Sequence, residues 1–169
     1  MGLDFVQSAW IVRDLPKAMD HWTRTYGVGP FFVIAHAQIE GLRYRGQPSG
    51  MDYSGALAFR GAMMIELIQQ HDSSPSVYNE AGNQADQFFH HICALTNDFE
   101  EHYDRFTKNN VVAAMEGRFG STRFAYFDTG PTIGCMTELV EETVEIRSVF
   151  QLIADANANW DGRDPVRQL

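Results

Sequence analysis

The chain is poor in cysteine and in basic side chains. With two cysteines in 169 residues, it has no disulfide framework, and we expect both thiols to be reduced. Lys and Arg number 13 against 22 Asp and Glu, which gives a net charge of −9. Nucleic acid is bound through clustered Lys and Arg, and no basic stripe is present, so the composition argues against nucleic acid as a partner.

The sequence also lacks a signal-peptide pattern and any apolar run long enough to cross a bilayer. We therefore expect a cytoplasmic protein without a membrane partner. Hydrophobic residues make up 44% and charged residues 21% of the chain, which is ordinary for a globular protein. The length suits one well-packed domain or two small fused modules.

The first seventy residues predict one helix among strands. Asp14 can cap a helix, Pro16 is tolerated in its first turn, and Gly27 is a suitable stop. The predicted strands of this part are 5–12, 30–39, 52–60 and 61–70. Residues 41–50 are rich in breakers and are predicted to form a loop, from which Arg43 and Arg45 could reach a ligand.

The same order restarts after a polar, breaker-rich connection at 71–87. A strand at 88–96 leads to a helix that Asp98 can cap and that Asn109 can end. Three further strands are predicted at 111–115, 123–128 and 133–141. From residue 142 there is no third copy, and the spacing of apolar residues predicts a helix that packs outside the sheets or on a partner subunit.

The two halves align as an internal duplication. Gln7 and Asp14 each lie 84 positions before their counterparts, His91 and Asp98. The closing strands align as well, with Ile65-Glu66-Leu67-Ile68 on Thr137-Glu138-Leu139-Val140. The repeat predicts an α+β fold of two paired βαβββ modules, residues 1–70 and 88–141, joined by 71–87 and followed by a helical extension at 142–169.

Four polar residues occupy equivalent places in the two copies: Gln7 and His91 on the opening strands, Glu66 and Glu138 on the closing strands. A carboxylate within an apolar run is costly to bury unless it is paired, metal-bound or shifted in pKa. Taken singly, each residue is explained as a solvent-facing strand residue. Taken together, they predict a site for zinc, nickel, cobalt or manganese.

Cys93 and His90 lie on the same predicted strand as His91, and strand alternation predicts where each points. Strand alternation places Cys93 on the face of His91, where it is expected to pack, with a thiolate ligand as the alternative. The same alternation turns His90 to the other side of the strand, at the surface or behind the site.

The sequence resembles the vicinal oxygen chelate superfamily over residues 5–141. This superfamily includes glyoxalase I, methylmalonyl-CoA epimerase, extradiol dioxygenases and the bleomycin and fosfomycin resistance proteins. The resemblance is most specific at three runs: Ile65-Glu66-Leu67-Ile68-Gln69, His90-His91-Ile92, and residues 116–129. It implies a cupped sheet of paired βαβββ modules around a metal ion.

The four candidate ligands are similar to the glutamine, glutamate, histidine, glutamate set of a eukaryotic glyoxalase I. That resemblance implies a lyase or isomerase that transfers a proton beside a metal-bound carbonyl of a small substrate or thioester. Glu138 is the first choice for the base, with Glu66 on the opposite face of the substrate. Gln7 and His91 would mainly hold the ion.

Two other functions remain open. Methylmalonyl-CoA epimerases resemble the His90-His91-Ile92 region, but they carry glutamine in place of Glu66 and a glutamate base on the third strand, where this chain has Ser54-Gly55-Ala56. A metal-free, resistance-type binding protein is the second alternative. Family members often complete the site across a dimer, so a homodimer is expected. Four arginines are candidates for binding an anionic substrate group: Arg43, Arg45, Arg118 and Arg123.

Overall fold

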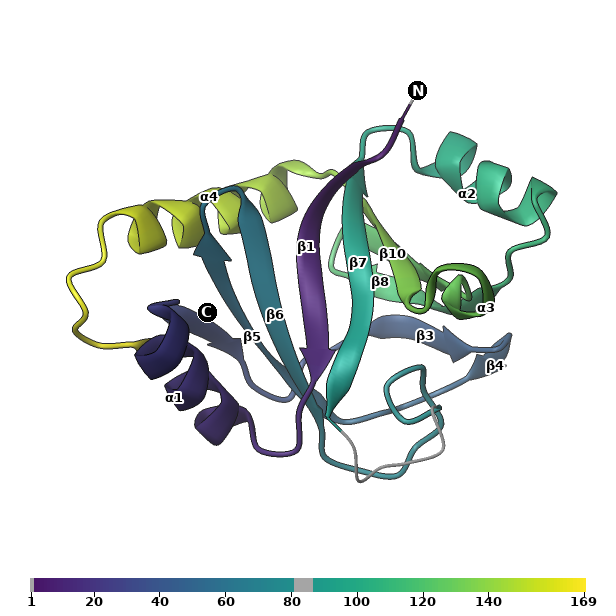
Figure 1. Cartoon of the computed structure of the whole chain (residues 1–169). Helices are drawn as coiled ribbons and strands as arrows, with labels where there is room; N and C mark the ends of the chain where they lie inside the picture. The colour runs from purple at the N-terminus through teal and green to yellow at the C-terminus, as the bar shows by residue number, and fades with distance from the viewer. Residues whose placement is uncertain (1, 81–86) are drawn as a thin grey trace.

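The computed structural model describes residues 2–80 and 87–169, which form a mixed sheet flanked by helices (Figure 1). Within these residues the sheet has eleven strands, in the order β11-β2-β5-β6-β1-β7-β10-β9-β8-β3-β4. The strands are β1 (Asp4–Ile11), β2 (Phe31–Ile34), β3 (Glu40–Tyr44), β4 (Gln47–Pro48), β5 (Tyr53–Arg60), β6 (Met63–Gln70), β7 (Phe88–Thr96), β8 (Ala113–Phe119), β9 (Thr122–Phe127), β10 (Met136–Glu141) and β11 (Val166–Gln168). The helices are α1 (Leu15–Tyr26), α2 (Phe99–Lys108), α3 (Gly130–Ile133) and α4 (Val144–Ala158).

The sheet consists of two halves with the same strand arrangement. In each half the opening strand pairs in parallel with the closing strand, β1 with β6 and β7 with β10. Each closing strand then pairs antiparallel with the strand before it, β6 with β5 and β10 with β9. β1 and β7 are antiparallel neighbours and join the halves. The predicted α+β fold of paired βαβββ modules is confirmed.

Helices α1 and α2 cover one face of the sheet, one in each half. Asp14 caps α1 by accepting a hydrogen bond from the backbone N–H of Lys17 at 3.0 Å, and Gly27 ends the helix with a φ of 65°. α1 packs on Leu67 and its neighbours, and α2 packs on Leu139 and its neighbours. Because side chains alternate along a strand, Glu66 and Glu138 point to the other face, called here the inner face.

The C-terminal helix α4 packs on the inner face, so its predicted position outside the sheets is wrong. Ile153 of α4 is fully buried against Leu57 and Met64. Leu57 is the β5 neighbour of Glu66, and Met64 precedes Glu66 by two residues, so both lie on its face. Asn157 fixes the end of α4, since its side chain donates to the Pro30 carbonyl at 3.1 Å. None of the described helices is long and apolar enough to cross a membrane.

Residues 41–50 were predicted to be a loop, but they contribute to the hairpin of β3 and β4. β3 pairs with β8 of the other half, with Tyr44 opposite Met115. Strand β11, which the sequence did not predict, extends the sheet by pairing with β2. Both additions depend on partners distant in sequence, and the local turn signals at Gly41 and Gly46 do not reveal them.

Candidate metal centre

The four predicted ligands lie on four adjacent strands at the middle of the sheet. Glu66 is on β6, Gln7 on β1, His91 on β7 and Glu138 on β10, and these strands are neighbours in that order. Ala9 is paired with both Glu66 and His91, and Gln7 precedes Ala9 by two residues. Met136 is paired with His91 and precedes Glu138 by two residues. The register therefore brings all four side chains to the inner face.

Three of these side chains form a compact group of possible ligands. The Nε2 atom of His91 lies 3.3 Å from Oε2 of Glu138 and 3.5 Å from Oε2 of Glu66. One ligand atom from each residue lies within 4.8 Å of the other two. The Nε2 atom of Gln7 donates to Oε2 of Glu66 at 2.5 Å, so Gln7 adjoins the group through that carboxylate.

One observation in particular indicates that a divalent cation fits this group. The Nε2 atom of His91 is buried and has no hydrogen-bond partner among the described residues, although two carboxylates face it. Two buried carboxylates that face one imidazole nitrogen require a positive charge among them, which either a proton on Nε2 or a metal ion bound there supplies. One imidazole and two carboxylates are a donor set that zinc, nickel, cobalt and manganese accept.

His90 determines which nitrogen of His91 faces the carboxylates. The Nε2 atom of His90 lies 3.0 Å from the Val77 carbonyl, and its Nδ1 atom lies 2.8 Å from Nδ1 of His91. A carbonyl only accepts hydrogen bonds, so His90 carries its proton on Nε2 and accepts at Nδ1. His91 then donates from Nδ1, and its Nε2 atom is directed at the acids. Such outer partners commonly orient metal-binding imidazoles.

The predicted alternation fails at His90 because β7 contains a bulge. Ala9 pairs with His91 and Trp10 pairs with Phe89, so His90 is an extra residue with no partner on β1. Its ring therefore contacts the ring of His91, at 5.1 Å between centroids, and is 4% exposed. The prediction that His90 faces away from His91 is wrong. The predicted alternative, a position behind the site, agrees with the contact between the two rings.

The titration of the site follows from burial and charge. Burial alone would lower the pKa of His91, but the carboxylates of Glu138 and Glu66, 3.3 Å and 3.5 Å from its Nε2 atom, outweigh it and raise that pKa to about 9. His91 is therefore protonated at neutral pH when no metal ion is bound, and an ion that binds at Nε2 displaces this proton. Burial lowers the pKa of His90 to about 3, which agrees with its neutral, accepting role. Burial, together with the charge of Glu138, raises the pKa of Cys93 well above its usual value. Cys93 is thus a thiol when no metal ion is bound.

Three tyrosines that the sequence did not single out complete the surroundings. Tyr53, Tyr78 and Tyr126 are buried on the inner side, and the hydroxyls of Tyr78 and Tyr126 lie 3.0 Å apart. Burial raises the pKa of all three well above its usual value, and the charges of Glu66 and Glu138 act in the same direction. Tyr126 lies within residues 116–129, one of the runs that resemble the superfamily. Tyr78 lies in the connection between the halves, where the sequence contains no motif that would identify it.

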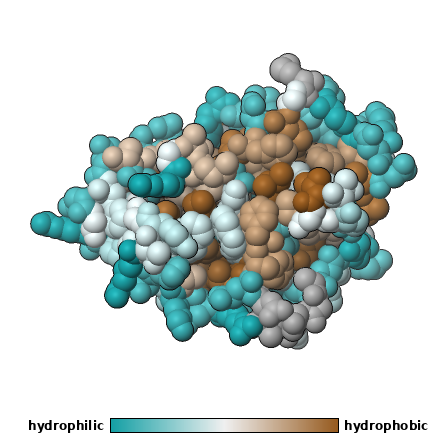
Figure 2. Space-filling model, viewed as in Figure 1, coloured by the Kyte–Doolittle hydropathy of each residue, from teal (hydrophilic) through white to brown (hydrophobic). Residues whose placement is uncertain are grey.

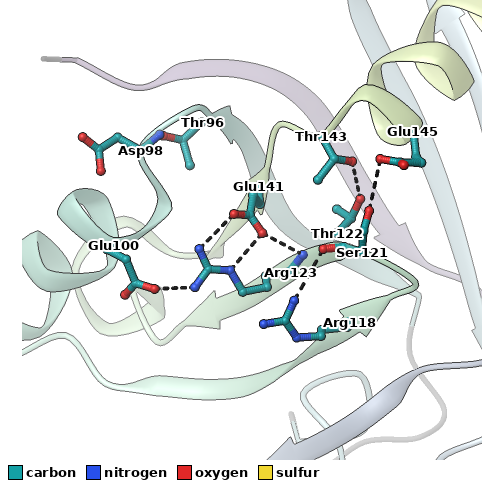
Figure 3. Close-up of polar contacts among 10 residues, drawn as sticks. All are labelled: Thr96, Asp98, Glu100, Arg118, Ser121, Thr122, Arg123, Glu141, Thr143 and Glu145. Atoms are coloured by element: carbon teal, nitrogen blue, oxygen red, sulfur yellow. Dashed lines mark hydrogen bonds and ion pairs between the residues drawn. The ribbon is translucent and has the colours of Figure 1, made fainter.

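Three of the four candidate arginines lie away from this group. Arg43, Arg118 and Arg123 line a cavity of about 540 Å³ between α2 and the strands β3 and β8. Figure 3 shows the Arg123 guanidinium between Glu141 and Glu100, with its Nε atom 2.8 Å from Oε2 of Glu141. This cavity borders α2, on the face opposite to Glu138.

Arg45 has a different environment. It forms an ion pair with Glu80, and its Nη2 atom lies 3.6 Å from Oδ2 of Asp128. It also lines a cavity of about 450 Å³ together with His90 and Met136. Arg45 is thus close to the outer partner of His91, unlike the three arginines beside α2.

The fold and the inward-facing acids and imidazole define a class of proteins with paired βαβββ modules. Residues 6–127 match the profile of the Glyoxalase/Bleomycin resistance protein/Dioxygenase superfamily. The chain belongs to this superfamily, whose members bind small molecules and are mostly metal-dependent enzymes. None of the curated proteins that were compared matches the chain.

Solved structures with similar folds include two methylmalonyl-CoA epimerases. The enzyme from Mycobacterium tuberculosis is 17% identical with a TM-score of 0.58, and the alignment covers 85% of this chain and 91% of that one. A Streptomyces coelicolor epimerase in complex with 2-nitronate-propionyl-CoA is 18% identical with a TM-score of 0.54, covering 85% and 100%. A hypothetical protein from Bacillus halodurans C-125 is 13% identical with a TM-score of 0.57, covering 85% and 96%. At these identities the likeness shows the fold alone.

Replacing His90 tests its part in orienting His91. We expect His90→Phe to weaken divalent metal binding by about 10–100-fold, the usual effect of removing an outer partner of a metal-binding imidazole. His90→Gln should restore part of the affinity, because its amide can both donate to Val77 and accept from His91. Isothermal titration of metal into chelator-treated protein measures the metal affinity of each variant. Equal affinity of the phenylalanine variant and the unmodified protein would contradict the orienting role.

Proposed function

We propose that this protein is a metal-dependent lyase or isomerase of glyoxalase type, which transfers a proton at the carbon next to a carbonyl of a small substrate or thioester. The proposal is carried by the buried, unpartnered Nε2 atom of His91, which faces carboxylates from two other strands. A buried group of this kind needs a positive charge at Nε2, and a divalent ion in place of the imidazole proton supplies it. Membership of a superfamily of mostly metal-dependent enzymes supports the same conclusion.

Within this proposal the four residues have different roles. His91, Glu66 and Glu138 hold the ion, and Gln7 either joins them or fixes Glu66 through its hydrogen bond. When bound, the divalent ion supplies Lewis-acid stabilisation of negative charge on a substrate oxygen.

Glu138 is the base in this proposal, and Glu66 serves the opposite face of the substrate. Burial raises the pKa of Glu66, and the 2.5 Å hydrogen bond that Gln7 donates to this carboxylate opposes that shift. Glu138 instead lies beside the thiol of Cys93, a weaker donor. The base is assigned to Glu138 from the resemblance of its strand to the glyoxalase ligand set, and Gln7 fixes Glu66 in its place beside the ion.

The surroundings suit proton transfer because they exclude water. Tyr53, Tyr78 and Tyr126 remain neutral and lie among apolar inner-face residues. In such low-polarity surroundings, charges that develop on a substrate interact more strongly with fixed dipoles than they do in water. The cavity shared by Arg45 and His90 is our candidate for the approach of an anionic substrate group.

Acyl-CoA epimerisation is the alternative activity, and the named epimerases among the similar structures favour it. It needs a second base on the far side of the substrate carbon. Ser54-Gly55-Ala56 on β5 supply no carboxylate, and Glu66 is the acid nearest to Gly55. Epimerisation would therefore depend on Glu66 for the second proton transfer. A metal-free binding protein, in which protonated His91 would balance the two carboxylates, is less well supported because members of the superfamily are mostly metal-dependent enzymes.

One set of assays separates these functions. Chelator-treated and metal-reconstituted protein are each given the hemithioacetal of a 2-oxoaldehyde and a thiol, and thioester formation is followed by absorbance. The same preparations are given a 2-methylmalonyl thioester in D2O, and deuterium entry at C2 is measured by mass spectrometry. We expect thioester formation that depends on one equivalent of metal at this centre. Exchange alone would identify the epimerase, and binding without either reaction would leave a resistance-type protein.

We also propose that the protein is a homodimer. Apolar side chains gather on the face shown in Figure 2, over the region where Figure 1 places β1 and β7. Phe5, Met63 and Phe89 of the central strands are 47%, 37% and 40% exposed. Exposed apolar patches commonly mark protein interfaces. Sedimentation equilibrium should give twice the chain mass of 19.1 kDa, and a monomer at all concentrations would refute the dimer.

A further inference from the structure

A second group of metal-binding side chains lies outside the proposed active site. His36 follows β2, Asp52 precedes β5, and His71 follows β6. One ligand atom from each of these residues lies within 4.8 Å of the other two. None of the three contributes to the group of Glu66, His91 and Glu138.

The side chains of this second group are already arranged around one point. Nδ1 of His36 lies 2.7 Å from Oδ1 of Asp52. The rings of His36 and His71 are 4.9 Å apart with an interplanar angle of 37°. The side chains of His36 and Asp52 are 64% and 44% exposed, so an ion has direct access from solvent.

The backbone that carries these residues is held by long-range hydrogen bonds. The N–H of His71 donates to the Asp52 carbonyl at 2.8 Å, and the N–H of Ala37 donates to the Tyr53 carbonyl at 2.9 Å. Ser54 joins the two histidines, because its Oγ accepts from the His36 N–H at 3.1 Å and lies 2.8 Å from Nε2 of His71. With Nε2 of His71 held by Ser54, Nδ1 is the nitrogen left for an ion.

We propose that His36, Asp52 and His71 form a surface site for a borderline divalent transition metal, namely zinc, nickel or copper(II). Two imidazoles and one carboxylate suit these ions, whereas magnesium and calcium prefer oxygen ligands alone. Ser54 supplies the hydrogen bond from the second imidazole nitrogen that metal-binding histidines commonly make. Three ligands and an exposed side leave positions for water or an exchangeable ligand. The bound ion would link the turn after β2 to the ends of β5 and β6.

Metal stoichiometry provides the test. Chelator-treated full-length protein is titrated with zinc by calorimetry, alongside His36→Gln, His71→Gln and the control His21→Gln, which changes an exposed histidine outside both groups. We expect each of the first two variants to lose one equivalent, or to weaken that binding at least about tenfold. His21→Gln should retain it. The double variant Glu66→Gln/Glu138→Gln should also retain it, which separates this site from the proposed active site.

A second measurement does not depend on the variants folding. Substoichiometric copper(II) is added to unmodified protein, and the histidine ring signals are followed by NMR. Among the exposed histidines, we expect the signals of His36 and His71 to broaden first, and that of His21 to broaden only at excess metal. Uniform broadening of the exposed histidines, or zinc stoichiometry unchanged in His36→Gln and His71→Gln, would overturn the proposal and leave a hydrogen-bonded pair of His36 and Asp52.

Discussion

Replacing Glu138 by glutamine is expected to reduce turnover by about 10²–10⁴-fold, the usual contribution of a positioned acid or base. Glutamine keeps the size of the side chain, but it cannot accept a proton at neutral pH and binds a divalent ion less well. It also removes one of the two charges facing Nε2 of His91, 3.3 Å away. Turnover and metal content of the purified variant are the two quantities to measure, with circular dichroism to confirm the fold.

The matched control is Glu141→Gln, three residues along the same strand. Glu141 makes its ion pair with Arg123, at 2.8 Å, on the side of the strand near α2 (Figure 3). Its replacement should lower stability by about 1 kcal/mol at most, as expected for a partly exposed pair, and leave metal content and turnover unchanged. Full activity in Glu138→Gln would remove Glu138 as the base. Equal losses in both variants would point to disturbance of β10.

The comparison of Glu138→Gln with Glu66→Gln separates the two acids by role. If both serve only as ligands, the two variants lose metal and activity in parallel. If Glu138 is the base, saturating metal should restore much of the activity of Glu66→Gln but little of that of Glu138→Gln. If Glu66 instead supplies a second proton transfer, saturating metal should restore the activity of neither variant.

The placement of these acids was predictable from the sequence because it depends on a repeat. Gln7 and His91 begin equivalent strands, and Glu66 and Glu138 end equivalent modules, so one parallel pairing in each half brings them together. The repeat says nothing about irregularities that differ between the copies. The bulge at His90 arises in the pairing of β1 with β7, and only that register reveals that neighbouring histidines share a side.

The additions to the two modules were not predictable for a related reason. β3 and β4 lie among breaker residues; β3 pairs with β8, some seventy residues away, and β4 pairs with β3. The surface group of His36, Asp52 and His71 likewise joins three segments that no motif connects. Local propensity describes single elements, whereas these features depend on contacts between elements.

The position of α4 leads to the second large effect, a loss of about 2–5 kcal/mol of unfolding free energy in Ile153→Ala. Ile153 is 0% exposed and is surrounded by Phe32, Leu57 and Met64, so truncation removes apolar contacts and leaves a cavity. Its neighbour Leu152 is 54% exposed, and Leu152→Ala should change stability by about 0.5 kcal/mol or less. Urea denaturation of both variants at one temperature measures the difference.

This pair of variants decides which face of α4 meets the sheet. Equal tolerance of the two substitutions would show that Ile153 does not pack on the sheet. On the inner face, α4 closes the side of the sheet that also carries Glu66, since Leu57 is the partner of Glu66 on β5. A loosened α4 should therefore admit water toward Glu66 and weaken metal binding in Ile153→Ala, but not in Leu152→Ala. Loss of stability without any change in metal affinity would limit α4 to a structural role.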